Sequence, residues 1–83
     1  MSRDATLRRV HWRARRGMLE LDIILERFLA EGVVRLSDAE LDTLERLLEC
    51  PDPDLYTWLM GYASPTDMEF FKLVEHIRHN DSV

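Results

Sequence analysis

Apolar residues recur every three or four positions along most of this chain, which is the spacing of one face of an α-helix. The pattern predicts five helices, at about residues 5–16, 18–31, 38–49, 53–62 and 65–79. Sustained strand alternation is missing, and only residues 33–36 lean toward β structure. We therefore predict an all-α fold, a compact single-domain bundle of about five short helices over residues 1–83, with frayed ends at 1–4 and 80–83.

Capping signals support these boundaries. Gly32 follows the second predicted helix, where a glycine in the left-handed conformation commonly ends a helix. N-cap signals precede the last three helices, and they are Ser37 with Glu40 (a capping box), Asp52 with Pro53, and Ser64 with Pro65. The apolar stripes predicted to face the core are Leu7, Val10 and Ala14; Met18, Leu21, Leu25, Phe28 and Leu29; Leu41, Leu44, Leu47 and Leu48; Leu55, Trp58, Leu59 and Tyr62; and Phe70, Leu73, Val74 and Ile77.

Charge is distributed unevenly along the chain, whose net charge is −5. Residues 1–16 hold six arginines and one acid, whereas residues 17–83 hold five bases and fifteen acids. Such a dipole can steer a protein onto a partner of complementary charge. A nucleic-acid binder is more usually basic overall, so we expect no nucleic-acid partner. The acids of the second and third helices are predicted to mark ordinary solvated faces.

Several function classes are disfavoured by what the sequence lacks. No apolar run approaches the roughly 20 residues that cross a bilayer, and the start has no signal-peptide core, so we expect a cytoplasmic protein without membrane insertion. One cysteine, Cys50, permits no intrachain disulfide. No nucleophile–base pair, phosphate loop or zinc spacing is present, which argues against an enzyme, a metal centre and a tightly bound cofactor.

An Arg-Gly-x-x-Glu element lies where the basic segment meets the acidic remainder. Gly17 breaks the helical pattern directly after Arg16, and Glu20 falls opposite the apolar stripe of the second helix. A plain helix–helix turn would explain this arrangement. A binding role is the alternative, because glycine lets another backbone approach closely and the flanking charges could face one partner.

The arginines of the first helix fall into two rows if that helix continues to residue 16. Arg9, Arg13 and Arg16 form one row at helical spacing, and Arg8, Trp12 and Arg15 form the neighbouring row. A solvated face is the simplest interpretation. However, an indole between guanidinium groups can anchor an interface, and arginine without lysine favours bidentate recognition of carboxylates or phosphates. His11 is interpreted as an interface or surface residue of the same helix.

Two sequence blocks carry a resemblance to a known family. Residues 10–22 (VHWRARRGMLELD) and 47–59 (LLECPDPDLYTWL) resemble the SdhE family of small helical assembly factors. Members help to attach FAD covalently to the flavoprotein subunit of succinate dehydrogenase and, in some bacteria, of fumarate reductase. The resemblance implies a five-helix protein that binds this subunit, while FAD itself belongs to the client. The partner-binding residues that it implies, together with neighbours on the first helix, are Arg16, Gly17, Glu20, Trp12, Arg13, Arg15, Arg9 and His11.

Other functions stay open at this point. The arginine rows could bind a nucleic acid or a membrane surface, in which case affinity would fall steeply with salt. An antitoxin-like partner of a small membrane toxin is a further possibility. The exposed position expected for Trp12 is compatible with either a monomer or a weak dimer.

Overall fold

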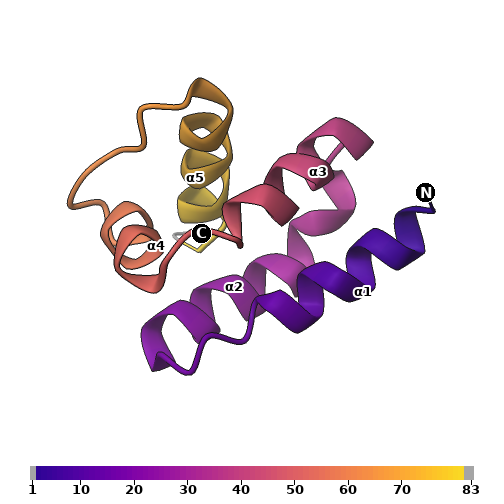
Figure 1. Ribbon diagram of the computed structural model, residues 1–83, viewed down its shortest axis with the longest axis horizontal. Coiled ribbons are helices and arrows are strands. Elements are labelled where there is room, and N and C mark those ends of the chain that lie inside the picture. Colours follow the sequence, from indigo (N-terminus) through magenta and orange to yellow (C-terminus); the bar gives the residue numbers. More distant parts are fainter. Residues whose placement is uncertain (1, 82–83) are drawn as a thin grey trace.

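The computed structural model describes residues 2–81, and within them the chain forms helices and short connections without any strand. In chain order the elements are α1 (Arg3–Arg13), α2 (Leu19–Glu31), the 3₁₀ helix η1 (Val33–Arg35), α3 (Asp38–Leu47), α4 (Asp52–Leu59) and α5 (Met68–Asp81). Figure 1 shows α1 and α2 running in opposite directions from a tight turn, with α4 and α5 on the far side of α2 from α1. The predicted all-α class is confirmed.

One apolar cluster lies between the helices, and most of the predicted inner faces contribute to it. Phe28 of α2 is its largest fully buried side chain. α2 packs mainly on α5, and α1 packs mainly on α3. However, α1 itself brings one buried apolar side chain, Val10, to this core, with the partly buried Leu7 and the C-cap residue Ala14 beside it. Because apolar burial stabilises in proportion to area, α1 must be held largely by other contacts.

The helix starts differ in how closely they match the prediction. The capping box at α3 is present, since the Ser37 hydroxyl accepts from the Glu40 N–H and the Glu40 carboxylate accepts from the Ser37 N–H. This bonding also lowers the pKa of Glu40. At α4 the N-cap is Pro51 rather than Asp52, so Pro53 lies at the second helical position. Proline is tolerated there because no intrahelical partner is lost in the first turn.

α5 begins three residues later than the predicted start at residue 65. The helix begins at Met68, and the Asp67 carboxylate accepts from the N–H groups of Glu69 and Phe70 at 2.8 and 3.1 Å. Asp67 therefore provides the cap that we assigned to Ser64 with Pro65. Pro65 is instead buried in the connection that precedes the helix.

Two of the turns also correct the prediction. Gly32 has φ −100°, a right-handed conformation, because the chain continues directly into η1 and needs no left-handed cap. The left-handed glycines are Gly17 and Gly61, at φ +79° and +83°. Gly61 ends α4 early enough that Tyr62 leaves the predicted buried stripe and is 73% exposed.

The ends of the chain can be compared with the expected fraying only in part. Ser2 caps α1 by accepting from the Ala5 N–H, and helical structure starts at Arg3. At the other end α5 extends to Asp81. Residues 1, 82 and 83 lie outside the described part of the chain.

Candidate functional site

The turn between α1 and α2 has a defined and open geometry. α1 ends at Arg13 instead of continuing to residue 16, and Ala14 is its C-cap. The Arg16 N–H donates to the Asp22 carboxylate at 2.9 Å, which ties the turn to the first turn of α2. Gly17 adopts φ +79°, and no atom lies within 4 Å of the place where its Cβ would be. Gly17 adopts this conformation without strain, and a bare stretch of backbone is therefore held open to solvent.

Arg16 points into the protein and not toward solvent. Its guanidinium donates to the carbonyl oxygens of Arg13, Leu48 and Cys50 at 3.0, 2.7 and 2.6 Å. It also donates to the Asp52 carboxylate at 2.8 Å, and its side chain is only 15% exposed. This guanidinium thus joins the end of α1, the end of α3 and the start of α4. The arginine of the Arg-Gly-x-x-Glu element has its donors occupied within the chain.

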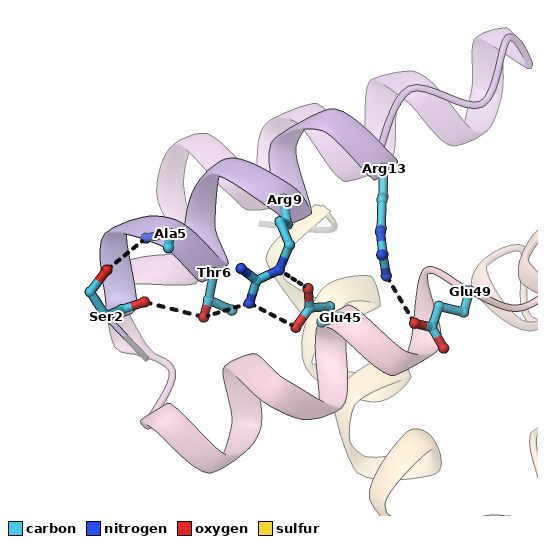
Figure 2. Close-up of polar contacts among 7 residues, drawn as sticks. All are labelled: Ser2, Ala5, Thr6, Arg9, Arg13, Glu45 and Glu49. Carbon is cyan, nitrogen blue, oxygen red and sulfur yellow. Dashed lines mark hydrogen bonds and ion pairs between the residues drawn. The ribbon is translucent and has the colours of Figure 1, made fainter.

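The row formed by Arg9, Arg13 and Arg16, here called the inner row, faces acidic side chains thirty-six residues further along the chain. Arg9 bonds to Glu45, Arg13 to Glu49 at 2.9 Å, and Arg16 to Asp52. Figure 2 shows the first two of these pairs, in which Arg9 of α1 meets Glu45 of α3 and Arg13 of α1 meets Glu49 just beyond the end of α3. A regular inter-helix ladder of this kind supplies the contact that the small apolar face of α1 does not.

Electrostatics within the ladder follow from its geometry. The hydrogen bond to Glu45 raises the pKa of Arg9, and the same bond lowers the pKa of Glu45. Arg9 also donates to the Thr6 hydroxyl, as Figure 2 shows. At the N-terminal end of α1, Arg3 pairs with Asp38 at 2.8 Å.

These pairs correct the prediction that the acids of the third helix are simply solvated. Three acids of this region, Asp38, Glu45 and Glu49, are bonded to arginines of α1. Glu45 in particular is 17% exposed at its side chain. Part of the dipole suggested by the charge distribution is consequently neutralised inside the molecule.

The other row, Arg8, Trp12 and Arg15, here called the outer row, has different surroundings. Trp12 is 82% exposed, the highest value among the large apolar side chains. Arg8 and Arg15 are exposed too, and within the described residues neither side chain makes a hydrogen bond or an ion pair. Since α1 ends at Arg13, Arg15 does not continue the helical row. It turns instead toward the space between α1 and α2.

That space is a groove of about 480 Å³ between the two helices. It is lined from α1 and its C-terminal end by His11, Ala14 and Arg15, at the turn by Gly17, and from α2 by Asp22, Glu26 and Leu29. Its size is in the range of small-molecule and peptide side-chain pockets. The groove brings together three predicted site residues, His11, Arg15 and Gly17.

Asp22, Glu26 and Leu29 line this groove and are not among the site residues predicted from the sequence. They lie at i, i+4 and i+7 and therefore share one face of α2. This spacing was visible in the sequence, but nothing there showed that the face would lie opposite His11 and Arg15. Ala14 and Leu29 are buried at 6% and 9% exposure and provide the apolar part of the lining.

Glu20 is exposed, as its position opposite the apolar stripe predicted. A second unpredicted feature lies near it, where the rings of Tyr56 and Tyr62 are 6.1 Å apart between centroids. Tyr62 chiefly raises the pKa of Tyr56, with smaller contributions from burial and from the negative charge of Glu20. The carboxylate of Glu20 is thus on the side of the molecule where α2 meets α4.

The remaining residues with reactive side chains, His76 and Cys50, pack against other parts of the protein. His76 packs edge-to-face on Phe28, with ring centroids 5.7 Å apart, and burial raises the pKa of the half-buried Cys50 thiol. Among the described residues no group of three His, Cys, Asp or Glu side chains could hold a metal ion. Within the same residues, none of the helices has the length and apolarity needed to cross a bilayer.

Comparison with known proteins gives consistent matches. A family model described as Sdh5, flavinator of succinate dehydrogenase, matches residues 8–81. The FAD assembly factor SdhE of Coxiella burnetii is 42% identical over 82 residues, which is 99% of this chain and 100% of that protein. The SdhE proteins of Yersinia pseudotuberculosis and Legionella pneumophila are 47% and 44% identical, over 84% and 88% of this chain and 80% and 91% of their own lengths.

Proposed function

This chain belongs to the Sdh5 family, the flavinators of succinate dehydrogenase, and from that premise we propose that it binds the flavoprotein subunit of succinate dehydrogenase and promotes covalent attachment of FAD. The relatives named FAD assembly factor support this role along nearly the whole chain. Fumarate reductase is a second client that the same surface could serve. We place the protein in the cytoplasm as a monomer or a weak dimer.

The observation that carries the proposal is the open backbone at Gly17. A positive φ and empty space around the missing Cβ occur together at an exposed turn. The turn is held in this conformation from two sides, by Arg16 and by Asp22. A protein surface that keeps a glycine bare and rigid offers a place where another chain can approach closely.

Around Gly17 the exposed residues predicted for partner binding divide into two groups. His11 and Arg15 line the groove, whereas Trp12 and Glu20 lie on exposed surface outside its lining. We assign all four to the docking face. We assign Arg9, Arg13 and Arg16 a positioning role, because their guanidinium groups bond to carboxylates of the same chain.

The mechanism that we propose is positional and not catalytic. Covalent flavin attachment joins FAD to a side chain of the client, so the client and its cofactor supply the reacting atoms. Holding two reactants in a productive orientation can lower a barrier by several kcal/mol without any proton transfer from the factor. Docking of the Gly17 face would stabilise the client conformation in which flavin and side chain meet.

Nucleic-acid binding is the weaker alternative for a structural reason. Of the six arginines in residues 1–16, four are engaged by carboxylates, namely Arg3, Arg9, Arg13 and Arg16. Within residues 1–16 only Arg8 and Arg15 remain for phosphates, on a chain whose net charge is −5. Binding to nucleic acid depends on neutralising many phosphates, for which two cations provide little.

The proposal is tested by in-gel flavin fluorescence of the flavoprotein subunit under denaturing conditions, in cells with and without this gene. Covalent flavin survives denaturation, so the band measures attachment directly. We expect the band to be lost without the gene, restored by the wild type, and weakened when the rescuing variant is Glu20→Ala. An unchanged band in the deletion strain would refute the proposed function.

Substitutions at Gly17 locate the docking face in the same assay. Gly17→Arg should not restore the band, because the new side chain would occupy the open space. Gly17→Ala introduces the same backbone strain as Gly17→Arg but adds only a methyl group, so it should restore most of the fluorescent band. Ala63→Arg adds the same charge at an exposed connection between α4 and α5 and should rescue fully. Full rescue by Gly17→Arg would remove Gly17 from the interface.

A further inference from the structure

The groove between α1 and α2 has walls of opposite charge. Arg15 stands on the α1 side, and Asp22 and Glu26 stand on the α2 side. Ala14 and Leu29 contribute buried apolar surface between them. Oppositely charged walls around an apolar floor are suited to a ligand that carries both signs of charge.

The charges of these walls do not neutralise each other. Arg15 and Glu26 are both exposed, and within the described residues neither side chain has a hydrogen bond or an ion pair. Asp22 differs because it accepts from the Arg16 N–H, so it serves mainly to hold the turn. By contrast, the guanidinium groups of the inner row bond to carboxylates of their own chain. The groove therefore keeps one cation and one anion available for another molecule.

We propose that this groove receives a short extended segment of the flavoprotein subunit, which presents a carboxylate to Arg15 and a guanidinium or ammonium group to Glu26. Apolar atoms of the segment would cover Ala14 and Leu29. Gly17 leaves the turn end of the groove open, so the backbone of the segment can pass there. The inference rests on the proposed function, because it names the chemistry of the partner at that site.

Charge complementarity favours this occupant over a polyanion or a purely acidic segment. A nucleic acid or a row of carboxylates would bind Arg15 but would be repelled by Glu26 and Asp22. A purely basic segment would meet the converse problem at Arg15. Like charges placed opposite each other in an interface cost affinity, so only a segment of mixed charge satisfies both walls.

The experiment inverts the polarity of the groove while keeping the net charge of the protein at −5. The double variant Arg15→Glu/Glu26→Arg exchanges the two charges. The matched control Arg35→Glu/Glu31→Arg makes the same exchange at two exposed residues that do not line the groove. Binding to the purified flavoprotein subunit, prepared from cells that lack this factor, is measured by isothermal titration calorimetry for all three proteins.

We expect the groove exchange to weaken binding about tenfold or more and the control exchange to leave it within about twofold, since opposed like charges replace attraction only in the groove. Raising the salt concentration should narrow the difference, because both attraction and repulsion are screened. Urea unfolding of each variant checks its fold. Should the double variant unfold, Arg15→Ala and Glu26→Gln are measured singly, and each should weaken binding several-fold.

The outcomes separate the two proposals. If the wild type binds and the groove exchange binds equally well, the groove assignment is wrong while the proposed function stands. If both exchanges weaken binding equally, the groove assignment is also wrong, because the affinity would then depend on surface charge in general and not on the groove. If the wild-type protein itself does not bind the subunit, the proposed function fails first.

Discussion

The two rows of the N-terminal segment are rich in arginine and lie one residue apart along the chain, yet they have different surroundings. The inner row of Arg9, Arg13 and Arg16 bonds to carboxylates of α3, of the connection that follows it and of α4. In the outer row, Arg8 and Arg15 lie exposed on either side of a Trp12 that is 82% exposed. One row therefore stabilises the fold, and the other is available to a partner.

This comparison changes the meaning of the Arg-Gly-x-x-Glu element. Its arginine and its glycine are adjacent in the sequence, but the arginine bonds within the protein and the glycine faces solvent. Arg16 closes hydrogen bonds to the ends of α1 and α3, and Gly17 presents bare backbone to solvent. The hydrogen bonds of Arg16 therefore fix the conformation of the open turn at Gly17 before any partner binds. Such preorganisation reduces the entropy cost of binding.

The largest expected effect comes from breaking the inner row at Arg16. Arg16→Ala should reduce the free energy of unfolding by about 2–3 kcal/mol, because three carbonyls and a carboxylate lose a charged donor in a poorly exposed place. Arg15→Ala, one residue earlier in the outer row, should change it by less than about 0.5 kcal/mol. Urea unfolding followed by far-UV circular dichroism gives both values. Similar values for the two variants would contradict the division into rows.

A smaller loss of stability is expected when the ion pair of Arg9 and Glu45 is broken, either by mutation or by lowering the pH. The pKa of Glu45 is lowered in the folded protein, so its contribution is present above its unfolded pKa of about 4.3 and is lost as the pH falls through the lower folded value. Glu45→Gln should therefore lower the midpoint of urea unfolding at pH 7, and the difference from the wild type should shrink as the pH falls toward 3. Some acid sensitivity should remain in the variant, because the pKa of Glu40 is lowered too.

The control for this pH series is Glu31→Gln, which removes an exposed acid of α2 outside the ladder. Its midpoint should stay close to that of the wild type at both pH values. A difference between wild type and Glu45→Gln that is as large at pH 3 as at pH 7 would show that the ionised pair is not the source of the effect.

The smallest effect on stability is expected at Trp12. Trp12→Ala should change the free energy of unfolding by less than about 0.5 kcal/mol, since the side chain makes little contact within the chain. Its fluorescence is the more informative quantity. In a Trp58→Phe background, Trp12 is the only indole, and its emission should move to shorter wavelength when the flavoprotein subunit covers it. Emission that does not change in a saturated complex would place Trp12 outside the interface.

Much of the fold was predictable because its signals are local. Helical period identified the buried faces of α2 and α3, and the capping box at Ser37 specified the start of α3 to the residue. Boundaries were less accurate where two signals competed. Asp52 and Pro53 indicated one start for α4, but Pro51 occupies the cap. Ser64 and Asp67 are both of a residue type that caps helices, and the structure shows that Asp67 accepts from the first N–H groups of α5.

The sequence by itself also determined the family, since two blocks at fixed separation resemble it and the comparisons match residues 8–81. The sequence did not show which glycine adopts the left-handed conformation. Gly17 and Gly32 both follow predicted helices, but only Gly17 has a positive φ. That choice depends on what the chain does next. After Gly32 it enters η1 directly, whereas after Arg16 it must reverse direction into α2.

Only the tertiary structure decided which arginines are free. Each pair of the inner row joins residues thirty-six apart, and that register is set by the packing of α1 on α3. The groove likewise exists because α1 packs on α3 while α2 packs on α5. Helical period and capping are local properties that a sequence contains directly. Ion pairs and grooves between distant helices depend on how those helices pack, which no local pattern specifies.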